Sequence, residues 1–155
     1  MKYIGAHVSS LPLVSDAPLE AHALGADAFA FNLTDAKRWR SPDYTPEDVE
    51  LFHERCVSFG FDADRMLPHS AFVINLGSPD ARKLHLSRLA FVDELMRCRQ
   101  LGVRLLNFHP GAHLKLKSED ECLDTVADSI NFALERTEEV TAVIENTAGQ
   151  GSNVG

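Results

Sequence analysis

Residues 141–155 read TAVIENTAGQGSNVG, a short apolar run that ends on Glu145 and passes into small polar residues and glycines. Such a run, bounded by turn-forming residues, predicts a buried β-strand over Thr141–Glu145. In parallel α/β proteins the chemistry gathers at the carboxyl ends of the strands, where the loops begin. A strand that ends on a carboxylate therefore indicates both a fold class and the place of a functional site.

The rest of the chain alternates strand and helix patterns. Thr45 and Pro46 open one helix, which Gly60 ends. Residues 78–80 open a long helix that runs to about Leu101, residues 118–121 have the spacing of a capping box, and residues 15–25 form a shorter helix. Four further short apolar runs predict strands: Tyr3–His7, Ala28–Phe31, Met66–His69 and Val103–His109.

This alternation predicts parallel strands joined by helical crossovers, in an open doubly wound sheet or a (β/α)8 barrel. The sequence contains neither G-x-G-x-x-G after the first strand nor G-x-x-x-x-G-K-[ST], so we expect no nucleotide cofactor, which favours the barrel. A barrel needs eight strands and typically about 250 residues. We therefore expect residues 1–155 to be a single domain, an incomplete α/β barrel of about five β-α units.

Composition limits the partners that the protein could bind and the cellular compartment in which it is expected. The 15 basic and 23 acidic residues give a net charge of −8, which argues against indiscriminate coating of nucleic acid or anionic membrane but permits a local basic patch. The three cysteines form no C-x-x-C pair and occupy apolar positions of helical patterns, as expected of core residues in a reducing cytoplasm. No signal peptide or membrane span is predicted, so we expect a cytoplasmic protein.

Chemistry-bearing side chains occupy the ends of all five predicted strands: His7, Asn32, His69, His109 and Glu145. Imidazole nitrogen and carboxylate oxygen are ligands typical of zinc. His69, His109 and Glu145 are therefore a candidate zinc site, although a single histidine at a strand end is more often a satisfied hydrogen-bonding residue. Convergence of separate strand ends in a barrel would bring the three together.

A second candidate surface follows the second strand. Lys37, Arg38 and Arg40 surround Trp39 in the stretch TDAKRWRS, residues 34–41. Basic side chains beside an exposed aromatic ring suit a phosphate backbone and an unstacked base. The alternative is a solvated loop in which Trp39 closes a small core. Phe72 also lies near the predicted barrel mouth, with ordinary core packing as its alternative.

Four motifs resemble the endonuclease IV family, the zinc-dependent apurinic/apyrimidinic endonucleases of DNA repair. They are YIGAHVS, LPHSAFVINLGSP, LLNFHPGAH and AVIENTAGQGSN, at residues 3–9, 67–79, 105–113 and 142–153. The similarity runs over residues 1–155, which correspond only to the N-terminal half or so of a complete family member.

The resemblance implies a barrel with three zinc ions at its mouth. His69, His109 and Glu145 would hold one zinc, and Glu145, as a catalytic residue, would also bridge to a second. The remaining ligands would come from the missing C-terminal half of the barrel. The implied reaction of base excision repair is hydrolysis of the phosphodiester 5′ to an abasic site in double-stranded DNA. The DNA-binding surface would be lined by five residues: Asp35, Lys37, Arg38, Trp39 and Phe72.

Some residues depart from the family pattern. Asp35 and Lys37 stand where the family usually has asparagine and arginine, and Phe72 stands where tyrosine is common. An aspartate that faced phosphate would repel it. Two alternatives to the endonuclease therefore stay open: a catalytically inactive metal-binding barrel fragment, and a sugar isomerase-like TIM-barrel metalloenzyme, which also uses histidine and glutamate at strand ends.

Overall fold

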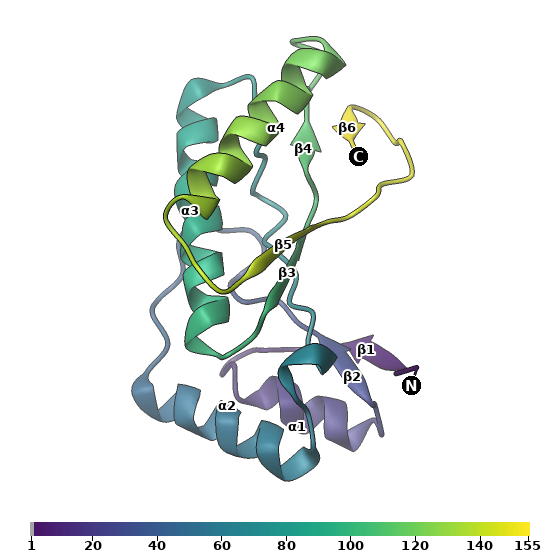
Figure 1. The fold of residues 1–155 in the computed structure, drawn as a ribbon, viewed down its shortest axis with the longest axis vertical. Helices are drawn as coiled ribbons and strands as arrows, with labels where there is room; N and C mark the ends of the chain where they lie inside the picture. Colours follow the sequence, from purple (N-terminus) through teal and green to yellow (C-terminus); the bar gives the residue numbers. More distant parts are fainter. Residues whose placement is uncertain (1) are drawn as a thin grey trace.

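The computed structural model describes residues 2–155 and confirms the alternation of strands and helices (Figure 1). In chain order the elements are β1 (Gly5–His7), α1 (Asp16–Ala23), β2 (Ala28–Ala30), α2 (Pro46–Phe59), a 3₁₀ turn (Ala63–Arg65), α3 (Ala81–Gln100), β3 (Leu105–Phe108), β4 (Gly111–Ala112), α4 (Glu119–Leu134), β5 (Thr141–Ile144) and β6 (Asn153–Val154).

Strands β1, β2, β3 and β5 run parallel in the predicted order. β1 pairs with β2 and β3 pairs with β5, while residues 66–69 lie between the two pairs. The nitrogen of His69 donates to the Phe31 carbonyl at 2.8 Å, and the nitrogen of Asn107 donates to the Pro68 carbonyl at 2.9 Å. The sheet is therefore continuous from β1 to β5.

The segment at residues 66–69 differs from the prediction of a regular strand. It makes isolated bridges to β2 and β3 rather than a ladder. The carbonyl group of Pro68 faces β3, but proline has no N–H to donate on that side. The missing donor shortens the ladder without moving the segment out of the sheet.

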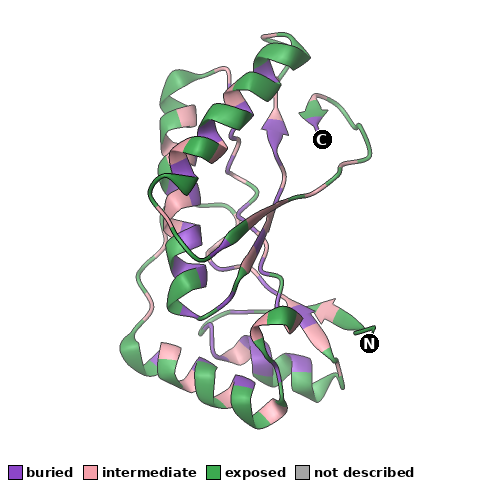
Figure 2. Ribbon diagram, viewed as in Figure 1, coloured by how far each residue is buried: buried purple, intermediate pink, exposed green. Residues whose placement is uncertain are grey.

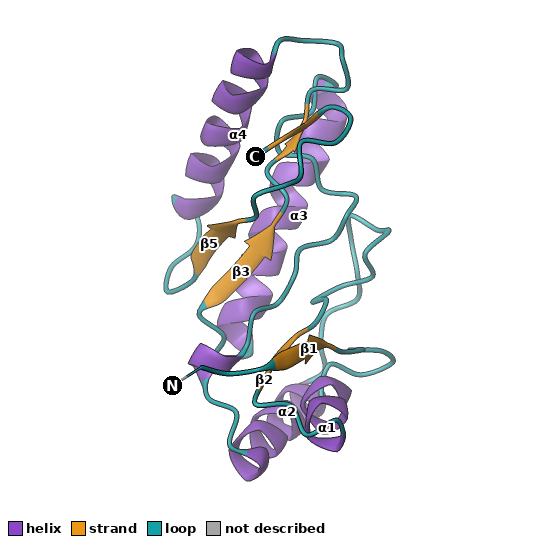
Figure 3. Ribbon diagram, turned by 90° about the vertical axis from the view of Figure 1, so that its right-hand side faces the viewer, coloured by secondary structure: helices purple, strands orange, loops and turns teal. Residues whose placement is uncertain are grey.

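The helices cover one face of the strands, and the main core lies between them (Figures 1 and 2). Phe108 of β3 packs against Phe91 of α3 with ring centroids 4.7 Å apart. The ring centroid of Phe31 lies 5.8 Å from that of Phe52 in α2. In the described part of the chain no helix covers the opposite face (Figure 3). That face holds a hollow of about 410 Å³ lined mainly by β1, β2 and residues 64–67.

Local signals set the helix ends as predicted. The Thr45 hydroxyl accepts a hydrogen bond from the nitrogen of Asp48, and Gly60 ends α2 in the left-handed conformation. Ser118 and Glu121 form a reciprocal capping box at the start of α4. α3 begins slightly later than the predicted opening, because Asp80 is the residue that caps it.

The antiparallel pair β4 and β6 was not predicted. Gly111 pairs with Val154 and Ala112 with Asn153. After β5 the chain bows away from the sheet, and this pairing brings its end back beside β4 (Figure 1). Two-residue strands carry no periodic pattern, so only the tertiary structure reveals them. Among residues 2–155, no helix combines the length and apolar character needed to cross a bilayer.

Candidate metal centre

Three side chains from separate strands meet at the carboxyl edge of the sheet. His69 ends the segment at residues 66–69, His109 follows β3 and Glu145 follows β5. One potential ligand atom from each lies within 4.8 Å of those from the other two. The structure thus brings together His69, His109 and Glu145, the three candidate ligands predicted from the strand ends.

The orientation of His69 suits a metal ligand. Its Nδ1 lies 2.7 Å from the Ser70 carbonyl oxygen. Because that oxygen can only accept, Nδ1 carries the hydrogen, and Nε2 of the neutral ring presents a lone pair. Nε2 lies 3.1 Å from Oε2 of Glu145. Two ligands of a tetrahedral zinc at ordinary bond lengths stand roughly 3.3 Å apart, so this spacing fits a shared cation.

The Nδ1 ring nitrogen of His109 is buried without a hydrogen-bond partner among the described residues, which is independent support for a bound ion. The ring centroid of His109 is 5.1 Å from that of His69. A buried polar atom without a partner is unfavourable, and imidazole nitrogen is a strong zinc ligand. The residues present therefore fit a zinc ion.

Glu145 is held as a carboxylate. Partial burial works to raise the pKa of Glu145, but the hydrogen bond from Asn107 and the nearby His69 and His109 rings lower it overall. The Asn107 amide donates to the same oxygen, Oε2, that faces His69. Sequence reasoning missed Asn107. The available signal was a polar residue between Leu106 and Phe108 in an otherwise apolar strand.

Replacing Asn107 by leucine is expected to weaken zinc binding by about 10–100-fold, the usual effect of removing a residue that orients a ligand. Chelator competition on the purified protein measures this affinity. Thermal unfolding of the metal-free variant controls for damage to the strand. Unchanged zinc affinity would show that Asn107 does not orient Glu145.

The other two strand ends lie beside this cluster but outside it. The ring of His7 is 6.4 Å from that of His69, and partial burial, with a smaller effect of His69, lowers the pKa of His7. The Asn32 side-chain oxygen is buried without a hydrogen-bond partner among the described residues. Neither belongs to the three-residue group.

The basic loop, residues 34–41, carries exposed Lys37, Arg38 and Arg40. Asp35 does not project a free charge: its Oδ2 pairs with Nε of Arg38 at 3.2 Å, and its Oδ1 accepts from the nitrogen of Lys37 at 3.0 Å. Trp39 is half-buried and packs against the core, as in the alternative in which it closes a small core.

Phe72 lies over His69 and His109 rather than in the core. It is 67% exposed, and its ring centroid is 5.5 Å from that of His69 and 6.0 Å from that of His109. The alternative of ordinary core packing is therefore wrong. The nitrogen of Val73 donates to the carbonyl of Ala36 at 3.3 Å, which ties the Phe72 segment to the basic loop.

Comparisons with known proteins agree with this architecture. Residues 18–155 match the family described as xylose isomerase-like TIM barrel. The whole chain is 53% identical to a "Probable endonuclease 4" of Chlorobium luteolum and 52% identical to one of Chlorobium phaeovibrioides, and covers 56% of each.

Solved structures give the same picture. Endonuclease IV from Thermus thermophilus is similar with a TM-score of 0.80 and 27% identity, over 99% of this chain and 55% of that one. A D-tagatose 3-epimerase-like protein has a TM-score of 0.71 at 19% identity, over 98% of this chain and 56% of that one, which shows the shared fold.

The chain thus spans about half the length of the relatives it matches, and the predicted α/β barrel type is confirmed. The chain belongs to the xylose isomerase-like TIM barrel family and, within it, corresponds to about half of an endonuclease IV family member.

Proposed function

We propose that the protein containing this chain is a zinc-dependent endonuclease that hydrolyses the phosphodiester 5′ to abasic sites in double-stranded DNA. The convergence of His69, His109 and Glu145 within 4.8 Å is the observation that carries the proposal. Its support is the 53% identity of the chain to a "Probable endonuclease 4".

Zinc at this site would polarise a phosphate oxygen and lower the pKa of a bound water toward neutrality. The chain's own residues orient the ligands for that role. The Ser70 carbonyl fixes the ring of His69, and Asn107 fixes the carboxylate of Glu145. This chain supplies one nearly complete ligand set, and the further ligands of a three-zinc centre would lie outside these 155 residues.

Charge on the basic loop supports contact with phosphate. The pairing of Asp35 with Arg38 offsets part of the repulsion that a free aspartate would cause. Lys37 and Arg40 remain exposed without a salt-bridge partner in the described part of the chain. The loop therefore presents net positive charge at the rim that bears Phe72, despite the overall charge of −8.

Lys37→Glu is expected to weaken binding to abasic-site DNA and to reduce the slope of log K against log salt by about 0.9 for each phosphate that the variant no longer neutralises. Fluorescence anisotropy over a salt series measures both quantities. Arg104→Glu is the matched control, because Arg104 is exposed at the amino end of β3, away from the rim. An unchanged slope for Lys37→Glu would mean that the loop does not touch phosphate.

Incision of a duplex with one abasic site, by the zinc-loaded full-length protein, tests the proposed function. Cleavage 5′ to the site, leaving a 3′-hydroxyl, is the expected result. Intact duplex after prolonged incubation would contradict it. A parallel assay of sugar isomerisation distinguishes the sugar isomerase-like alternative, and zinc binding without either activity would indicate the inactive barrel.

A further inference from the structure

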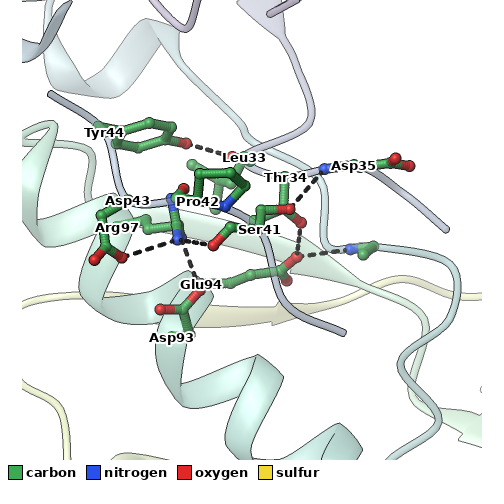
Figure 4. Close-up of polar contacts among 11 residues, drawn as sticks. Leu33, Thr34, Asp35, Ser41, Pro42, Asp43, Tyr44, Asp93, Glu94 and Arg97 are labelled. Atoms are coloured by element: carbon green, nitrogen blue, oxygen red, sulfur yellow. Dashed lines mark hydrogen bonds and ion pairs between the residues drawn. The ribbon is translucent and has the colours of Figure 1, made fainter. Parts of the chain in front are cut away.

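Beneath the rim, the buried face of α3 carries two charged side chains one turn apart. Glu94 is 1% exposed and Arg97 is 4% exposed. Burying a charged group is unfavourable unless it finds partners. Figure 4 shows that Glu94 contacts Thr34 at the start of the basic loop, and that Arg97 contacts Ser41 and Pro42 at its end and Asp93 on its own helix.

Glu94 joins two segments of the rim through one oxygen atom. Its Oε1 accepts from the Thr34 hydroxyl at 2.9 Å and from the nitrogen of Ala71 at 3.0 Å. Thr34 begins the basic loop, and Ala71 immediately precedes Phe72. A single carboxyl group thus fixes the start of the loop relative to the aromatic residue beside the metal ligands.

Arg97 holds the other end of the same loop. Its guanidinium donates to the carbonyls of Ser41 at 3.1 Å and Pro42 at 3.0 Å, while Asp93 pairs with it at 2.7 Å (Figure 4). The Ser41 hydroxyl in turn accepts from the nitrogen of Asp35 at 3.2 Å. Both ends of the loop are therefore anchored on one helix.

Packing alone does not account for a carboxyl group at position 94. An apolar side chain of similar size would fill the space without the cost of desolvation. Burial raises the pKa of Glu94, although hydrogen bonds from Ala71 and Thr34 oppose the rise. What the carboxyl group adds over an apolar side chain is a fixed direction for two loop segments.

We propose that Glu94 is a positioning residue that holds Phe72 and the basic loop as one unit on the rim, with Arg97 securing the far end of that loop. The inference rests on the proposed function, since DNA is the partner that this rim would contact. Glu94 itself is too deeply buried to touch DNA.

Three variants of the full-length protein test the proposal. Glu94→Leu fills the space but accepts no hydrogen bond, whereas Glu94→Gln retains an acceptor of the same shape. Leu95→Ala makes a core cavity at the next residue of α3 and controls for general destabilisation. Should Glu94→Leu fail to fold, Thr34→Val removes only the hydroxyl donor to Glu94.

Trp39 reports the position of the basic loop independently of activity. It is the only tryptophan of these 155 residues, and its signal is obtained by difference from the Trp39→Phe background. Acrylamide quenching of Trp39 should rise about twofold in Glu94→Leu and in Thr34→Val. It should stay at the parent value in Glu94→Gln and Leu95→Ala.

On the abasic duplex, Glu94→Leu should raise KM about tenfold and change kcat less than about twofold, because the metal ligands stay in place. Glu94→Gln should restore the parent KM. Unchanged quenching, unchanged KM, or an equal KM rise in Leu95→Ala would overturn the inference. Lack of incision by the parent would instead overturn the proposed function, and quenching would still decide whether Glu94 holds the loop.

Discussion

Replacing Glu145 by glutamine is expected to lower the zinc content of the protein and to reduce incision of abasic-site DNA by at least about 1000-fold. The neutral amide lacks the charge that would bind the proposed cation, and it is a weaker ligand than a carboxylate. It also disturbs the contacts that Oε2 makes with His69 and Asn107. Elemental analysis and single-turnover incision measure the two effects separately.

Glu138→Gln makes the same chemical change at an exposed position just before β5 and serves as the control. It should keep the parent zinc content and rate. Equal zinc stoichiometry and parent rates in Glu145→Gln would remove Glu145 from the site.

Gly111→Ala is expected to destabilise the fold strongly. Gly111 has a φ of +149°, and an added Cβ would lie 2.6 Å from Asn75 Oδ1 and 2.7 Å from the nitrogen of Gly77. Asn75 bonds both the nitrogen and the carbonyl of Ala112, so the clash would displace the segment that follows His109. We expect a loss of more than about 3 kcal/mol in the free energy of unfolding.

Gly25→Ala separates backbone strain from steric overlap in the same urea-unfolding experiment. Gly25 has a φ of +69°, and its added Cβ would meet nothing within 4 Å. That substitution should cost only about 1 kcal/mol. An equal loss of stability in both variants would show that the close approach of Gly111 to Gly77 does not add to the cost of the substitution.

Most of the fold was predictable because its signals are local. The Thr45 cap, the Gly60 stop and the capping box at Ser118 each act within one helical turn, and the structure shows all three. The strand predicted over Met66–His69 is only partly formed, with isolated bridges in place of a ladder, because Pro68 lacks a donor. β6 was missed because its pairing partner lies some 40 residues earlier in the chain.

The candidate site was only partly predictable. His69, His109 and Glu145 stand at strand ends, which a parallel sheet places along one edge. The residues that support the site gave weaker signals: Glu94 and Arg97 lie in a helix rich in charged residues, where the sequence pattern does not show which are buried. Their burial depends on loop partners more than 20 residues away.

Anomalous diffraction at the zinc edge, from crystals of the zinc-loaded protein, tests the metal centre most directly. We expect a peak about 2.0–2.2 Å from ligand atoms of His69, His109 and Glu145 together. Zinc bound elsewhere, with these three side chains free of it, would contradict the assignment.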